Sequence, residues 1–246
     1  MHTAAAPLTG VYRPGYPFTA AELQSLTFQG VLRHMLADVY AEAGLPGSSA
    51  VRATAAAALL STTLRTAGVL CGETAAWVHL GAAAPQHSSV ITDGVYRRPT
   101  HGSWQIHQVP LNQADAEQVG RMQVTTPERT AADIYCGIGT ADGRRAMDRL
   151  LKNPDLADQL HYWPPAAQPL DDRDYLIWNP SPADERRLEH RMDLIGELMH
   201  HGRTTPAKVL STVLRVLSVT DRDAPRARRA SRLLGQCASR RLPTVR

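Results

Sequence analysis

The spacing of apolar residues changes near Thr126, and this change constrains the fold more than any other feature of the chain. Before Thr126, short apolar stretches are separated by turn residues, and the side chains of 104–109 alternate as in a half-buried strand. After Thr126, apolar residues recur every three or four positions, as on the buried face of a helix. We therefore predict an α+β fold with its strands in the first half and a helical C-terminal region.

Capping and turn residues place the predicted elements. Thr19 and Glu22 have the spacing of a capping box, which opens a short helix over 19–26. Gly30 separates this helix from two short strands over 31–40, with a tight bend at Ala37-Asp38. Further along the chain we expect helices over 49–65 and 73–80, and strands over 68–71, 89–92, 104–109 and 122–125.

The C-terminal half is predicted to consist of helices with one interruption. Residues 162–182 hold five of the 17 prolines and are interpreted as a connector. Two stripes at helical spacing follow, and they indicate packed core: Leu188, Met192, Ile195 and Met199, then Val209, Val213, Leu214 and Leu217. A last helix is expected over 224–241.

Charge is distributed unevenly. Residues 201–246 contain 11 Lys and Arg against 2 Asp and Glu, whereas residues 1–200 contain 16 against 21. A basic block of this kind attracts polyanions or an acidic protein surface. The alternative is a solvated helix without a partner.

Sequence patterns for catalysis and for metal binding are not found. The chain has no Gly-Lys-Ser/Thr phosphate loop and no His-Glu-x-x-His pair. Gly102-Ser103 is not followed by the paired carboxylates of a nucleotidyltransferase. Cys71, Cys136 and Cys237 are too far apart for a close-spaced zinc site. We expect no enzyme activity, no metal and no cofactor.

The chain has neither an apolar run long enough to span a bilayer nor a signal-peptide pattern at its N-terminal residues. We therefore expect a cytoplasmic protein that does not associate with membranes.

Three stretches together resemble a known family. They are Phe18-Thr-Ala-Ala-Glu-Leu23 with Gly30-Val-Leu-Arg33 and Val39-Tyr40, then Gly72-Glu-Thr-Ala-Ala-Trp-Val-His-Leu-Gly81, and then Val124-Thr-Thr-Pro-Glu-Arg-Thr-Ala-Ala-Asp133. In this order they are similar to the AbiEi-type antitoxins, particularly the actinobacterial members. The resemblance covers roughly residues 16–150.

The resemblance implies a modular antitoxin. Its N-terminal winged helix would bind inverted repeats in the promoter of its own operon, and an α/β domain would neutralise a nucleotidyltransferase-like toxin, with or without a stable complex. The corresponding segments here are a truncated winged-helix-like segment over 1–45, an α/β antitoxin domain over 46–160, and a Pro-rich connector with an Arg-rich helical region over 161–246.

The candidate DNA-binding residues lie at both ends of the chain. In the winged-helix-like segment they are Thr19, Gln24, Arg33 and His34. The hairpin departs from the family's basic wing because it carries Ala37-Asp38, so the Arg-rich last helix is a second candidate. Its residues are Arg226, Arg228, Arg229 and Arg232.

The third stretch has two readings. Thr126 and Pro127 suit the start of a helix, Glu128 suits the positive end of its dipole, and Arg129 and Asp133 are spaced for an ion pair. These residues either anchor a structural helix or neutralise the toxin. Two other functions stay open for the whole chain: a free-standing DNA-binding transcriptional regulator, or an enzyme that modifies the toxin.

Overall fold

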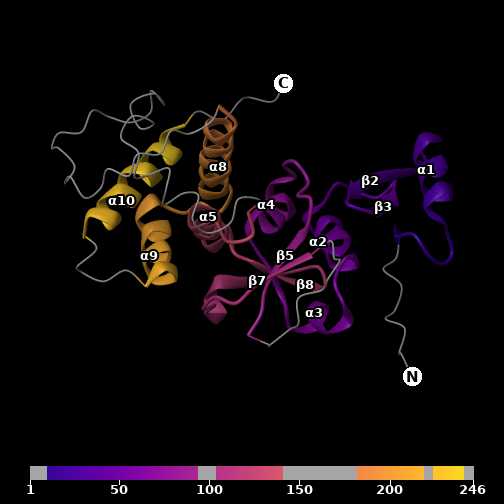
Figure 1. The fold of residues 1–246 in the computed structure, drawn as a ribbon, viewed down its shortest axis with the longest axis horizontal. Helices are drawn as coiled ribbons and strands as arrows, with labels where there is room; N and C mark the ends of the chain where they lie inside the picture. The colour runs from indigo at the N-terminus through magenta and orange to yellow at the C-terminus, as the bar shows by residue number, and fades with distance from the viewer. Residues whose placement is uncertain (1–9, 94–103, 141–181, 219–223, 241–246) are drawn as a thin grey trace. The chain divides into compact units, whose positions relative to one another are not determined.

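The computed structural model describes residues 10–93, 104–140, 182–218 and 224–240 (Figure 1). The side chains of 182–185 and 224–226 are not described. The chain divides into two compact units, Met1–Thr126 and Pro127–Arg246. This division differs from the boundaries expected at residues 45 and 160, and each unit is described by itself below.

The first unit begins with a helix and a small sheet. Three strands pair antiparallel in the order β1-β3-β2, and a helix precedes the β2–β3 hairpin. Their bounds are β1 Val11–Tyr12, α1 Ala20–Phe28, β2 Leu32–Leu36 and β3 Val39–Glu42. The predicted capping box is confirmed, since Thr19 and Glu22 satisfy each other's backbone N–H groups. The predicted bend is confirmed as well, and Ala37 has a φ of +46° there.

A mixed five-stranded sheet forms the rest of this unit, in the order β6-β5-β4-β8-β7. β4 runs parallel to β8, β5 runs parallel to β6, and the other two pairs are antiparallel. Helices α2 and α4 pack on each other and on this sheet. The bounds are α2 Ser49–Ala58, α3 Thr62–Ala67, β4 Val69–Leu70, α4 Gly72–Leu80, β5 Ser88–Ile91, β6 Trp104–His107, the 3-10 helix η1 Gln113–Asp115, β7 Ala116–Val119 and β8 Met122–Thr125.

The helix predicted over 49–65 is wrong in one respect, because two helices occupy this stretch. α2 ends in a tight turn, and the Ser61 hydroxyl then accepts a hydrogen bond from the Leu64 N–H at 3.3 Å to start α3. The break allows Leu59, Leu60 and Leu64 all to enter the core. The Ala-rich pattern indicated a single helix, but Ser is neutral to unfavourable within helices and favoured at caps, and Ser61 starts a new helix here.

Strands β1 and β7 were not predicted. β1 has two residues, too few to show a pattern. β7 has the sequence Ala-Glu-Gln-Val, without the strong apolar alternation of a strand, and forms because Gly120 turns the chain back onto β8 with a φ of +60°.

One hydrophobic cluster joins the hairpin to α2 and the five-stranded sheet. Leu36, Val39 and Ala41 from the hairpin share a cluster with Ala56 of α2 and Val124 of β8. The N-terminal segment is therefore packed into the α/β unit and is not a separate domain.

The described parts of the second unit consist mainly of helices. α5 packs on α8 and α9, and α10 packs on the same two helices. The bounds are α5 Pro127–Cys136, α8 Pro182–His201, α9 Pro206–Leu217 and α10 Ala224–Ser239.

The two apolar stripes predicted in the C-terminal half belong to α8 and α9. The α8 stripe is buried, as are Val209 and Val213 of α9, while Leu214 and Leu217 are partly buried. The α+β class with C-terminal helices is thus confirmed. The predicted Pro-rich connector lies outside the described residues, apart from the start of α8.

Candidate functional site

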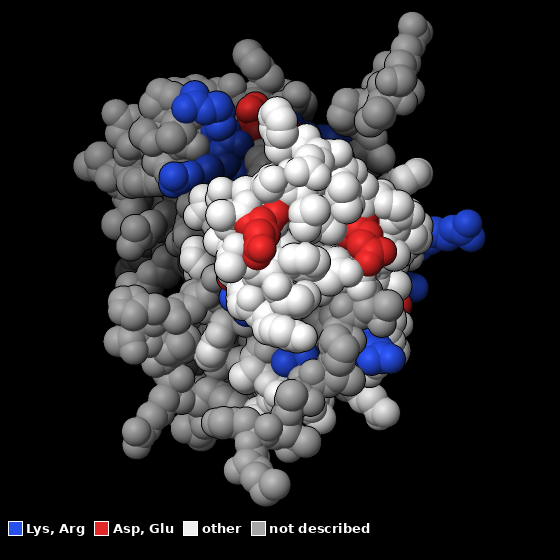
Figure 2. Space-filling model, turned by 90° about the vertical axis from the view of Figure 1, so that its right-hand side faces the viewer, with Lys and Arg blue, Asp and Glu red and all other residues white. Residues whose placement is uncertain are grey.

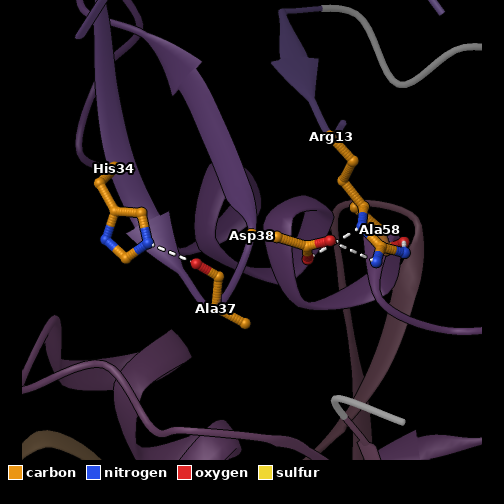
Figure 3. Close-up of polar contacts among 5 residues, drawn as sticks. All are labelled: Arg13, His34, Ala37, Asp38 and Ala58. Carbon is orange, nitrogen blue, oxygen red and sulfur yellow. Dashed lines mark hydrogen bonds and ion pairs between the residues drawn. The ribbon is translucent and has the colours of Figure 1, made fainter. Parts of the chain in front are cut away.

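The basic side chains near the hairpin bind groups of their own chain. Arg13 donates two hydrogen bonds to the carboxylate of Asp38, at 3.1 and 2.7 Å, and one to the Ala58 carbonyl at 3.1 Å (Figure 3). His34 lies 2.6 Å from the Ala37 carbonyl through Nε2 and makes an edge-to-face contact with Tyr40. Arg13 and Asp38 neutralise each other at the tip of the hairpin, so the tip carries little net positive charge.

Arg33 holds the segment that joins the hairpin to α2. Its Nη2 donates to the carbonyls of Leu45 and Pro46, at 3.0 and 3.2 Å. Arg52 of α2 donates to the next carbonyl, that of Gly47, and to the carbonyls of Val78 and His79 at the end of α4. Burial, and secondarily the charge of Arg33, lower the pKa of Arg52. Arg33 therefore holds the backbone of this connecting segment in place.

Helix α1 presents few charges. The Thr19 hydroxyl accepts a hydrogen bond from the Glu22 N–H and so caps the helix. The backbone N–H of Thr19 and, secondarily, its hydroxyl donate to the Glu22 carboxylate, and these bonds lower the pKa of that carboxyl. Gln24 is exposed, whereas its neighbour Leu23 is the buried residue of the helix. Figure 2 shows this side of the first unit: two acidic groups stand apart in a broad uncharged area, and basic groups lie toward its margin.

Sequence reasoning missed the exposed hydrophobic residues of this segment. Tyr16, Phe28 and Val31 are 100%, 96% and 51% exposed. A signal was available, because the chain has only two Phe and both lie in this segment. Phe18, in contrast with Phe28, is partly buried and packs edge-to-face on Tyr12.

The structure buries the centre of the third stretch. The Arg129 Nε donates to the Asp133 Oδ1 at 2.8 Å, and both side chains are 0% exposed. Glu128 accepts from the hydroxyls of Thr204 and Thr212, at 3.1 and 3.0 Å, and so ties the start of α5 to α9 and the turn before it. These contacts favour the anchoring role, since an enclosed Arg129 does not reach a partner without a rearrangement of its unit.

The ends of this stretch also have structural positions. The Thr126 N–H donates to the Asp115 carbonyl at 2.8 Å, and Pro127 is the first residue of α5. Pro127 also lies against Gly202, where an added Cβ would be 2.7 Å from the proline Cβ.

The Arg-rich last helix exposes part of its charge. Arg228 and Arg232, one turn apart on α10, are exposed, and Arg229 is partly buried. The side chain of Arg226 lies outside the described residues. Arg240, which follows α10, forms an ion pair with Asp193 of α8 at 2.8 Å and is largely enclosed. The structure therefore separates the two sets of predicted DNA-binding residues into different units.

Within the described ranges, no group of three or more His, Cys, Asp or Glu residues could hold a metal ion. In the same ranges, no helix is long and apolar enough to cross a membrane.

Comparison of the chain with protein-family models, with curated proteins and with solved structures finds no match.

Proposed function

We propose that this chain is a non-enzymatic antitoxin that neutralises a cognate nucleotidyltransferase-like toxin. The supporting observation is that each stretch of the family resemblance holds a position on which the fold depends. The first contains the capping box of α1, the second is helix α4 against the sheet, and the third contains the buried Arg129–Asp133 pair. Because these residues support the fold, their resemblance to the family favours a shared architecture over a chance match of short motifs.

Neutralisation by binding fits the chemistry of the site better than neutralisation by catalysis. The polar groups gathered at the hairpin and at α5 bind backbone carbonyls, hydroxyls or each other. A catalyst instead aims such groups at a substrate.

A second candidate function is repression of the protein's own operon, either alongside neutralisation or as a free-standing regulator. Arg228 and Arg232 carry this candidate, because exposed arginines one turn apart on a helix suit contact with phosphates. The winged-helix-like segment supports it less, because the tip of its hairpin carries Asp38 in an ion pair with Arg13.

Co-expression tests the antitoxin proposal. The neighbouring nucleotidyltransferase-like gene is induced in a host together with the full chain, and growth is measured. We expect the full chain to restore growth. A toxic neighbour that the full chain does not counter would overturn the proposal and leave the DNA-binding regulator.

Fluorescence anisotropy with the promoter DNA of the operon tests the second candidate. Replacing Arg228 and Arg232 by Gln should weaken binding and reduce the slope of log K against log salt by about 2, since each lost phosphate contact removes about 0.9. The matched control replaces Arg186 and Arg187, two exposed arginines of α8, by Gln. Equal loss in both variants would indicate general attraction to charge and not a site on α10.

A further inference from the structure

The exposed large hydrophobic side chains of the first unit lie on one short segment that contains helix α1. In the described parts of the chain, the large hydrophobic residues classed as exposed are Tyr16, Phe28 and Val31, all within 16–31. Scattered surface hydrophobic residues are normal, but two aromatic side chains almost fully in solvent on one short segment call for an explanation.

Backbone contacts place these side chains at the two ends of α1. The Val31 N–H donates to the Leu26 carbonyl at 3.0 Å, so Val31 folds back onto the last turn, where Phe28 lies. Gly30 makes this return possible with a φ of +74°. Tyr16 lies three residues before the cap at Thr19. A helix of nine residues is about 13 Å long, so Tyr16 precedes one end of it and Phe28 lies at the other.

The surface between the two ends is exposed and uncharged. Ala21, Gln24, Ser25 and Phe28 recur at three- and four-residue spacing along the outer side of α1, and all four are exposed. Small side chains in the middle let another surface approach the helix closely. Cores of protein interfaces combine aromatic residues with few charges, as this face does.

The segment that carries this face is acidic in balance. Residues 10–45 hold Arg13 and Arg33 against Glu22, Asp38 and Glu42, a net charge of −1. Both arginines are engaged within the chain, Arg13 with Asp38. Glu22 and Glu42 are exposed. Glu22 accepts the hydrogen bonds of the helix cap, which lower its pKa, and Glu42 accepts one from the Tyr12 hydroxyl at 2.7 Å.

These charges favour one class of binding partner for the outer face of α1 over the others. Nucleic acid is disfavoured, because phosphates would meet carboxylates and no available arginine on this face. A symmetric pair of copies is disfavoured as well, because a two-fold interface would place the same acidic groups on both sides. A protein surface with an apolar centre and Lys or Arg at its rim complements both the aromatic groups and the carboxylates.

We propose that the outer face of α1, with Tyr16, Phe28 and Val31 as apolar anchors and Glu22 and Glu42 at the rim, docks the toxin through a basic-rimmed apolar patch on that protein. This inference rests on the proposed function and adds the surface through which the partner is held. Tyr16 and Phe28 should contribute most of the binding energy, because aromatic residues that become buried dominate binding energy at interfaces.

The test measures binding of the full chain to the purified, catalytically inactivated product of the neighbouring gene by isothermal titration calorimetry. The double variant Tyr16→Ser and Phe28→Ser should bind at least about tenfold more weakly. Its thermal unfolding should match that of the original chain, since both side chains are in solvent. Glu42→Arg should weaken binding and increase the loss of affinity in the double variant. The same charge change at Glu197 on α8 should leave the affinity unchanged.

Four outcomes would overturn the docking site. Two are unchanged affinity of the double variant and growth rescue by a chain that shows no binding to the toxin. A third is a concentration-dependent dimer in light scattering that the double variant abolishes, which would assign the face to a second copy. Loss of promoter binding in the double variant would assign it to DNA and would also count against the proposal. Failure of the full chain to rescue growth is a different result, because it removes the antitoxin function itself.

Discussion

Burial decides what an ion pair contributes to stability, and two of the ion pairs that the structure describes differ mainly in exposure. Arg129 and Asp133 are 2.8 Å apart with both side chains 0% exposed, whereas Arg13 and Asp38 are 2.7 Å apart with 39% and 40% exposed. Water and salt screen the second pair, while the first has only protein around it. The same interaction therefore anchors α5 in one place and only stabilises a hairpin tip in the other.

Replacing Asp133 by Ala should lower the free energy of unfolding of the helical unit by about 3–5 kcal/mol, because the buried Arg129 charge would lose the Asp133 carboxylate. Replacing Asp38 by Ala is the matched control and should cost about 1 kcal/mol or less. Urea unfolding followed by circular dichroism measures both. The double variant Arg129→Met and Asp133→Leu should recover much of the loss, and equal costs for the two single variants would contradict this account.

Cys237 should not react in the folded protein. Burial raises its pKa to about 12, so the reactive thiolate is scarce near neutral pH, and the side chain is enclosed in α10. With a thiol reagent such as DTNB at pH 8, we expect no labelling of Cys237 in the native state and full labelling in denaturant. Mass spectrometry of the labelled protein distinguishes it from Cys71 and Cys136. Fast native labelling at Cys237 would show that α10 opens from the helices beneath it.

At the scale of elements, the close approach of α8 and α10 depends on one glycine. A Cβ added to Gly196 would lie 2.6 Å from the Cys237 carbonyl oxygen, which is a backbone atom and cannot turn aside. Gly235 of α10 has no neighbour within 4 Å of its added Cβ. Two helical glycines of the same unit therefore have opposite roles, although the sequence presents both simply as weak helix formers.

Gly196→Ala should destabilise the helical unit by about 1–3 kcal/mol, the usual cost of overpacking. Gly235→Ala, as its control, should stabilise the unit by about 0.5–1 kcal/mol, because Ala loses less conformational entropy in a helix. Urea midpoints of the two variants should move in opposite directions. A stabilised Gly196→Ala would mean that the helices separate without cost.

At the scale of the whole molecule, the units are defined by cores and not by linkers. The hairpin, α2 and β8 contribute to one cluster, so the first unit runs from the N-terminal segment to Thr126. The second unit begins with α5, whose residues 129–136 are all buried. Each unit should therefore contain the contacts needed for its own stability.

Residues 1–126 expressed alone should fold and give a dispersed amide NMR spectrum. Residues 46–126, cut where the sequence placed a domain boundary, should not, because Leu36, Val39 and Ala41 are missing from their core. A folded 46–126 fragment would restore the hairpin as an independent domain.

The sequence by itself determined the local structure. The capping box at Thr19, the bend at Ala37-Asp38, the start of α5 at Pro127 and the apolar stripe of α8 were all predicted, because their causes lie within a few residues of each other. Strand β7 was not, since it depends on pairing with β8 more than on its own residues.

Only the tertiary structure decided which residues are enclosed and which face solvent. Arg129 and Asp133 matched a surface ion pair in spacing yet are fully buried, while Phe28 matched a core residue in type yet is exposed. Arg33, predicted to contact DNA, holds backbone carbonyls twelve residues away. Burial depends on which distant segments pack over a side chain, and no pattern within a single helix or strand contains that information.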